Sequence, residues 1–282
     1  MRNVVVFPAL LAVLLHAPLL SAQTAGSSSP PGWPSCPRCQ TAQEKTQARQ
    51  KYGVDGKAFD PHDISGIWGN NGVELNVVVP PFTPKGKEMY DATRAEETPD
   101  GVAISNSKDP MLICDPLGYP RWFAYNYGFQ FVVLPDRVMQ FFELGHTWRD
   151  IWTDGRTLPD DPPQARWLGY AIGRWEGDTF IVESNGYDDR SWIQEDRRDR
   201  RWGFPHSDQM RVVERYRRTS FGTLDAELTI VDPVVFKKPW VTHAVIELSA
   251  GTELGEYMCV PSENEAFNAQ KIRPQVTGGK SK

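Results

Sequence analysis

The stretch FELGHTWRDIWTDGR, residues 142–156, gathers one histidine, two tryptophans, two arginines and three acidic side chains. His146 is a candidate general base or metal ligand, because an imidazole exchanges its proton near neutral pH. Arg149 is a candidate anion clamp or ion-pair partner, because a guanidinium donates two parallel hydrogen bonds to a carboxylate. The alternative is structural: Arg149 and the acids form ion pairs, and His146 is a hydrogen-bonded spacer.

A second group of candidates lies near residue 210. His206 comes just before a predicted strand that carries Glu214, so the imidazole is expected near one end of that strand and the carboxylate deeper inside. Two histidines and one carboxylate can hold a divalent metal, and a histidine with a carboxylate can form an acid–base pair. The candidate catalytic groups are therefore His146, His206, Glu214 and Asp154, with the presence of a metal left open. No HExxH, GxSxG or phosphate-binding glycine loop occurs in the sequence.

The strand that carries Glu214 must orient it. Residues 211–217 read RVVERYR, and the side chains of a strand alternate between two faces. The three arginines share one face and cannot point into a core, so Glu214 is predicted to point inward with Val212 and Tyr216. A buried carboxylate is costly unless a cation or a donor accompanies it, and Arg149 is the candidate partner.

Residues 147–153 are predicted to form another strand, with Gly145 before it and an Asp154–Gly155 turn after it. Arg149 and the two tryptophans then lie on opposite faces. The chain has ten tryptophans, and aromatic side chains with a few polar groups are typical of a site for a planar or apolar ligand. The candidate ligand-binding residues are Arg149, Arg121, Trp148, Trp152, Tyr127 and Tyr216.

The fold class predicted is mainly β: a single antiparallel barrel, lipocalin-like but elaborated, with one short N-terminal helix. From Tyr125 onward the apolar pattern has a period of two, and short turns predict three hairpins: FQFVVL with RVMQFFEL, YAIGRW with DTFIVES, and RVVERYRR with LDAELTIVD. HAVIELS and GEYMCV are predicted as closing strands. A helix is predicted from Thr83–Pro84 through KGKEMYDATRAEE, and residues 40–52 could form another without an apolar stripe.

The N-terminus predicts export. A short positive start, an apolar run to Leu20 and the small residues that follow are typical of a cleaved signal peptide, so we expect a secreted or periplasmic protein with no integral membrane segment in the mature chain. The predicted division is a signal peptide at 1–25, a loosely ordered leader at 26–60, the barrel domain at 61–270 and a disordered tail at 271–282. A net charge of -5 argues against a nucleic-acid partner.

Four cysteines in an exported chain favour pairing. Cys114 and Cys259 stand far apart and are predicted to form one long-range disulfide. Cys36 and Cys39 form CPRC in the leader, which favours a local disulfide; redox activity of this motif stays open, although it lacks the setting of a thioredoxin motif and the histidine of a haem attachment site.

The chain resembles a large family of exported proteins from soil and other environmental bacteria. The resemblance rests on DISGIW, PFTPKGKEMYD, CDPLGYPR, HTWRDIWTDGR, GRWEGDTFIVES, HSDQMRVVERYRR, DPVVFKKPW and EYMCVPSEN. It implies one domain and carries no activity with it. The resemblance also implies a set of characteristic polar residues: Cys114, Arg121, His146, Arg149, Asp154, Arg156, Asp178, His206, Glu214 and Cys259. Gly66–Ile67–Trp68 is also similar to the Gly-x-Trp that begins the first strand of lipocalin-type barrels.

Three functions follow as alternatives. The first is a barrel that binds a small hydrophobic or aromatic molecule, with its charged side chains orienting the ligand. The second is a small-molecule hydrolase or lyase that uses His146 or His206 as base, with or without a metal. The third is a structural or interaction role with a sealed core. Convergence of His146, His206 and Glu214 on one site would favour the second.

Overall fold

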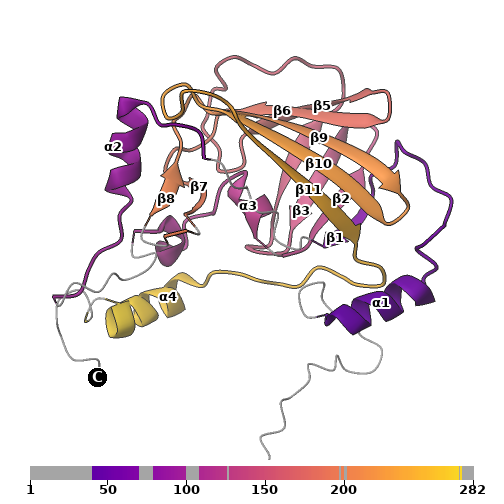
Figure 1. Cartoon of the computed structure of the whole chain (residues 1–282), viewed down its shortest axis with the longest axis horizontal. Helices are drawn as coiled ribbons and strands as arrows, with labels where there is room; N and C mark the ends of the chain where they lie inside the picture. Colours follow the sequence, from indigo (N-terminus) through magenta and orange to yellow (C-terminus); the bar gives the residue numbers. More distant parts are fainter. Residues whose placement is uncertain are drawn as a thin grey trace, which may run out of the picture.

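A computed structural model describes residues 40–69, 79–99, 108–125, 127–196, 198–199, 202–272 and 274. Its centre is a closed barrel whose strands follow the order β1-β11-β10-β9-β6-β5-β4-β3-β2 (Figure 1). The bounds of these strands are β1 Gly66–Gly69, β2 Phe129–Val133, β3 Arg137–Phe142, β4 Thr147–Trp152, β5 Tyr170–Glu176, β6 Thr179–Asn185, β9 Arg211–Ser220, β10 Thr223–Val231 and β11 Trp240–Leu248. The predicted mainly β class and barrel are confirmed.

The three predicted hairpins form the neighbouring pairs β2–β3, β5–β6 and β9–β10. Gly177 has a φ of 55° in the turn between β5 and β6, a conformation that glycine adopts without a side-chain clash. Short turns of this kind leave sequential strands adjacent and antiparallel. The local pattern was therefore sufficient to predict most of the barrel wall.

The expectation of an entirely antiparallel barrel is wrong at one pair of strands. β4 and β5 run parallel, with Ile151 opposite Ala171 and Trp152 opposite Ile172. The chain between them, residues 153–169, is too long for a tight turn. A crossover of this kind brings the next strand in with the same direction.

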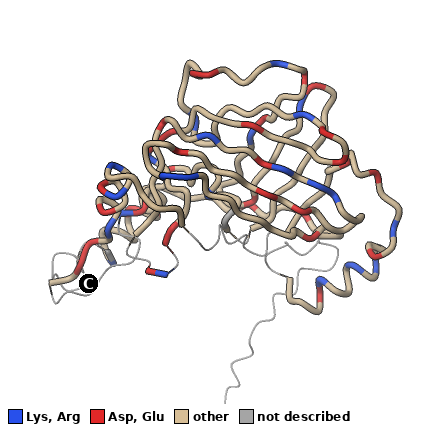
Figure 2. The backbone as a smooth tube through the Cα atoms, turned by 45° about the horizontal axis from the view of Figure 1, so that its top comes forward, with Lys and Arg blue, Asp and Glu red and all other residues tan. Residues whose placement is uncertain are grey.

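Alternation divides the barrel into an inner and an outer face, as predicted. Every second residue of β10 from Leu224 to Ile230 is buried. On β9, Val212, Glu214 and Tyr216 are buried, while Arg211, Arg215 and Arg217 on the other face are exposed. Charged residues therefore recur along the strands of the barrel wall (Figure 2). Arg218 also points inward, at the end of β9, where its guanidinium donates to the Phe221 and Asp63 carbonyl oxygens.

Helices and a small second sheet lie outside the barrel wall, except α3, which lies among the strands (Figure 1). The helical segments are α1 Ala42–Lys51, α2 Pro84–Ala92, η1 Pro110–Ile113, α3 Arg121–Ala124, α4 Pro261–Phe267 and η2 Asn268–Ile272, and the sheet pairs β7 Trp192–Glu195 with β8 Gly203–Pro205. α1 has a capping box between Thr41 and Glu44 but buries none of its residues, in line with its lack of an apolar stripe.

The predicted helix at Thr83–Pro84 forms as α2 and is shorter than expected. The Thr83 hydroxyl accepts the Gly86 amide at 2.9 Å, which caps the first turn. α2 ends at Ala92 and does not reach Glu97, because the Thr93 side chain turns onto β8 and exchanges hydrogen bonds with the Gly203 backbone at 2.9 and 3.0 Å.

The C-terminal segment is held by the predicted disulfide between Cys114 and Cys259. GEYMCV, however, is not a closing strand: Tyr257 forms only an isolated bridge with Leu144. The edge of β11 is already occupied by β1, which pairs Trp68 with Leu248 and closes the barrel against β2. GEYMCV therefore has no free strand edge at β11 with which to form a ladder of backbone hydrogen bonds.

Some predictions fall on other parts of the chain. The signal peptide and the CPRC cysteines, Cys36 and Cys39, lie outside the described residues, as does most of the C-terminal tail. In the part that the structure describes, no helix is both long enough and apolar enough to cross a membrane.

Candidate functional site

The candidate site is an ion pair in the barrel interior. Arg149 of β4 donates from its two terminal nitrogens to the two carboxylate oxygens of Glu214 on β9, at 2.9 and 2.6 Å. Glu214 is 0% exposed and Arg149 is 3% exposed. The inward orientation predicted for Glu214 is confirmed, and its cation is the predicted one. A two-point geometry fixes both side chains relative to each other.

Three further side chains complete the cluster. The phenol hydroxyls of Tyr119 and Tyr216 each donate to Glu214 Oε2 at 2.6 Å, and Arg149 Nε donates to Gln140 Oε1 at 2.8 Å. The Tyr119 ring also covers the guanidinium, with its centroid 3.8 Å from the central carbon. We call these five residues, Tyr119, Gln140, Arg149, Glu214 and Tyr216, the interior cluster. Its formal charge is zero, because one cation meets one anion.

Burial and the ion pair shift the pKa values of the cluster together. Burial raises the pKa of Tyr119 and of Tyr216, and the adjacent Glu214 charge raises both further, so both lie well above the usual range for a phenol. Burial acts against the Arg149 cation, but the charge and hydrogen bonds of Glu214 outweigh it, and the pKa of Arg149 is raised. The cluster thus keeps its donors protonated.

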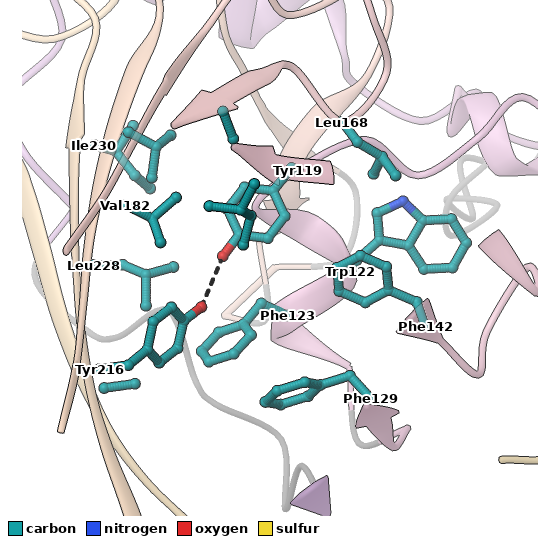
Figure 3. Close-up of a cluster of buried hydrophobic side chains, with 14 of the residues drawn as sticks. Tyr119, Trp122, Phe123, Phe129, Phe142, Leu168, Val182, Tyr216, Leu228 and Ile230 are labelled. Atoms are coloured by element: carbon teal, nitrogen blue, oxygen red, sulfur yellow. Dashed lines mark hydrogen bonds between the residues drawn. The ribbon is translucent and has the colours of Figure 1, made fainter. Parts of the chain in front are cut away.

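Aromatic side chains pack in the barrel core near Tyr119 and Tyr216, and three of them, Tyr119, Trp122 and Phe123, come from one short segment (Figure 3). We call residues 118–125, which include α3, the α3 segment. Its Phe123 ring packs 6.2 Å from Tyr216 and 5.5 Å from Phe129, and its Trp122 ring stacks 5.8 Å from Phe142. The Tyr119 and Tyr216 hydroxyls lie 3.4 Å apart across the interior. The α3 segment therefore fills the barrel beside the interior cluster.

Arg121, predicted as a ligand-binding residue, lies in a separate buried ion pair. It is 0% exposed and binds Asp109 with two nitrogens, one at 2.7 Å, while its second nitrogen also donates to the Tyr125 hydroxyl at 3.0 Å. Burial opposes the cation, but Asp109 raises the pKa of Arg121 overall. This pair fastens the α3 segment to the turn that precedes it.

His206 is fully buried and lies in a second polar site. Its Nδ1 is 3.0 Å from the Ser207 carbonyl oxygen, which can only accept, so Nδ1 carries the proton. Its Nε2 is then an acceptor 2.8 Å from Ser191 Oγ, whose one hydroxyl proton can go to Nε2 or to the Asp188 carbonyl oxygen at 3.2 Å. Burial lowers the pKa of His206, although the Ser207 hydrogen bond and nearby acids oppose this shift. The neutral imidazole is the form that this site holds.

Tyr187 lies between the two polar sites. Its ring meets the His206 ring edge-on, with 6.2 Å between centroids, and its hydroxyl is 2.5 Å from Ser184 Oγ. Burial raises its pKa, while the charge of Arg149 lowers it and that of Glu214 raises it. His206 therefore contacts Tyr187, and among the described contacts it forms no hydrogen bond to the Glu214 carboxylate.

The other predicted site residues lie on the outside. His146 is exposed, with a φ of 47°, and Asp154 is exposed and pairs with Arg156 at 2.5 Å. Trp148 is 54% exposed, and Trp152 is covered by the guanidinium of Arg156 at 3.8 Å. The structure therefore does not bring His146 to His206 and Glu214. Within the described ranges, no three His, Cys, Asp or Glu side chains are arranged to hold a metal ion.

Tyr127, also predicted to bind ligand, packs edge-on against Tyr257 of the C-terminal segment, with 5.1 Å between centroids. This contact joins the start of β2 to the chain that carries Cys259. Neither tyrosine belongs to the interior cluster.

Sequence reasoning missed Tyr119, Gln140 and Ser191. Gln140 had a signal, because the alternation of RVMQFFEL places it on the same face as Val138 and Phe142. Tyr119 and Ser191 lie in irregular chain, where no periodicity predicts direction.

Comparison of the chain with models of protein families, with characterised proteins and with solved structures finds no match.

Proposed function

We propose that the protein is an exported β-barrel that binds a small, uncharged hydrophobic or aromatic molecule carrying a hydrogen-bond acceptor. The ligand would lie in the barrel interior beside the interior cluster. The observation that carries this proposal is the side-chain amide of Gln140: its Nε2 is buried and has no hydrogen-bond partner among the residues that the structure describes.

The orientation of that amide supports the proposal. Gln140 Oε1 accepts from Arg149 Nε, and a flipped amide would set two donors against each other. The two N–H bonds of Nε2 therefore point away from the guanidinium with no acceptor. A buried donor without a partner costs about 1–3 kcal/mol. An acceptor on a ligand would remove that cost.

The balance of charge in the cluster selects the ligand's charge. Arg149 is neutralised by Glu214, so the site has no spare cation for an anionic ligand and no spare carboxylate for a cationic one. Trp122 supplies a second donor, its indole Nε1, which also has no partner within the described part of the chain; its ring stacks against Phe142. Aromatic walls with two free donors suit a ketone, ether or lactone attached to an apolar body.

Entry of a ligand requires movement of the α3 segment. Gln140 and Glu214 are both 0% exposed, and Trp122 and Phe123 lie in the core next to the cluster. Displacing a short segment is a common way for a closed barrel to admit a ligand, and the ligand then occupies the volume that the side chains vacate.

Paired compounds test the proposal. An aromatic ketone such as propiophenone and the hydrocarbon propylbenzene differ by one acceptor, and the ketone should bind about fivefold more tightly, since one hydrogen bond is worth about 1 kcal/mol. Gln140→Leu should remove that preference, while Gln130→Leu, a glutamine on the outer face of β2, should preserve it. Equal binding of the two compounds, or no binding of either by calorimetry, would reject the proposal.

One observation favours a hydrolase as a second candidate. Ser191 Oγ and His206 Nε2 are at hydrogen-bond distance, and the tautomer of His206 leaves Nε2 free to take the serine proton. A fluorophosphonate probe should then label Ser191 in the wild type and not in His206→Gln. Absence of labelling in the wild type would leave only the binding function.

A further inference from the structure

The disulfide between Cys114 and Cys259 lies at the surface and joins two segments that are 145 residues apart in the sequence. Cys259 is exposed and Cys114 is half-buried. Cys114 also has a φ of 62°, a left-handed conformation that residues other than glycine seldom adopt. Exposed disulfides are the ones that thiols reach and cleave most readily.

Both segments that this bond joins carry exposed apolar side chains. Five large ones come from the two short segments that it joins, and we call them the disulfide surface: Met111, Ile113, Met258, Val260 and Phe267. Ile113 is 67% exposed and Met258 is 60% exposed, each adjacent to a half-cystine. Several exposed apolar side chains on two linked segments favour a protein-binding surface.

Hydrogen bonds also join the two segments. The Leu112 carbonyl oxygen accepts from the side-chain amides of Asn264 and Asn268, the latter at 2.5 Å. On its other side the C-terminal segment is fixed to the barrel, where the Gly145 amide donates to the Tyr257 carbonyl oxygen at 2.5 Å. The disulfide is therefore the covalent link between η1 and a segment anchored on the β3–β4 turn.

We propose that the disulfide surface is the docking site of a thiol–disulfide oxidoreductase that reduces the Cys114–Cys259 bond. A thiolate of the enzyme attacks the exposed Cys259 sulfur, a mixed disulfide forms, and Cys114 leaves and takes up a proton. The second enzyme thiol then breaks the mixed disulfide and releases Cys259 as a thiol. The enzyme dithiol is oxidised by two electrons and the substrate disulfide is reduced by two.

The position of the disulfide within this surface indicates which kind of protein would dock there. A docking protein that makes apolar contacts with Ile113 and Met258 has its contact area on both sides of the sulfur atoms, where a reducing enzyme must place its cysteines. Reduction should release η1 and α4 from each other and leave the interior cluster intact, because Tyr119 and Glu214 are held by contacts inside the barrel.

Trapping tests the proposal on the whole chain, with Cys36→Ser and Cys39→Ser so that CPRC does not react. Thioredoxin with its resolving cysteine replaced by serine should form a mixed disulfide, and peptide mass spectrometry should locate it at Cys259. Absence of a trapped complex, or trapping mainly at Cys114, would overturn the proposal.

Rates provide a second test. Ile113→Ser with Met258→Ser should slow reduction by intact thioredoxin about tenfold, the loss expected from two apolar contacts, and leave reduction by dithiothreitol unchanged. Val245→Ser is the control, because Val245 is an exposed apolar residue on β11. An equal slowing with both reductants, or none with thioredoxin, would contradict docking at this surface.

Discussion

Arg149 and Glu214 meet across the interior of the barrel, from strands that are not neighbours. β5 and β6 separate β4 from β9 in the wall, and yet the guanidinium and the carboxylate form two hydrogen bonds of 2.9 and 2.6 Å. The pair therefore depends on the closure of the barrel, which brings these two side chains together. Loss of the pair should therefore lower the free energy of unfolding of the whole barrel.

Glu214→Gln should lower the free energy of unfolding by about 3–5 kcal/mol, because it leaves the Arg149 charge buried without its counter-ion. Urea unfolding followed by circular dichroism measures this change. Arg149→Met combined with Glu214→Leu should recover much of the loss, since an apolar pair requires no counter-ion. Glu227 forms a surface ion pair with Arg215 at 3.8 Å, and Glu227→Gln should change the free energy of unfolding by less than about 0.5 kcal/mol. A similar effect of the two single variants would contradict the importance of burial.

Alkaline titration should separate the nine tyrosines into two groups. Tyr90, Tyr119, Tyr125, Tyr187 and Tyr216 have raised pKa values, chiefly because of burial. A group whose pKa is higher in the folded state stabilises the fold fully below its unfolded value of 10.0, and this stabilisation is lost as pH rises above that value. Ultraviolet absorbance should therefore show these phenols ionising late and together with unfolding. Ionisation of all nine near pH 10 in the folded protein would be the contrary result.

His206 should make stability depend on pH on the acidic side of neutrality. Its pKa is lowered by burial, so the unfolded chain takes up a proton at a pH where the folded protein does not. Its contribution is complete above the unfolded value of 6.5 and declines as pH falls below it, by at most about 1.4 kcal/mol per pH unit. Urea midpoints between about pH 5 and 8 measure the slope. His206→Gln should flatten it, whereas His146→Gln, at an exposed position, serves as the control. A slope that survives His206→Gln must come from other groups.

Gly145→Ala should be more damaging than Gly155→Ala, although both glycines have positive φ values, 78° and 83°. A Cβ at Gly145 would lie 2.0 Å from the Trp122 ring, whereas one at Gly155 meets nothing within 4 Å. Gly155→Ala should cost about 1–2 kcal/mol from backbone conformation alone, and Gly145→Ala about 1–3 kcal/mol more from the clash. Thermal unfolding with tryptophan fluorescence tests this, because the α3 segment carries Trp122. Equal costs would mean that the Trp122 contact is not tight.

The direction of Glu214 could be predicted from sequence because a strand repeats every two residues, and three arginines on one face leave only the other for the core. The same rule predicted the inner face of β10. Because a buried Glu214 needs a cation, Arg149 was then predicted as its ion-pair partner. The rule did not predict Tyr119, whose chain is irregular. It also did not predict the orientation of His146, because this residue has a left-handed backbone conformation just before β4 and its side chain is exposed.

The amino-acid sequence by itself determined most of the barrel strands, their inward faces and the need of one buried carboxylate for a cation, because these depend on neighbours along the chain. Only the tertiary structure decided that β4 and β5 run parallel, that β1 closes the barrel and that the α3 segment enters it. Contacts across a barrel depend on strand order and closure, and local alternation contains no information about either. That is why Glu214 was found from sequence, while Tyr119 and the free amide of Gln140 were not.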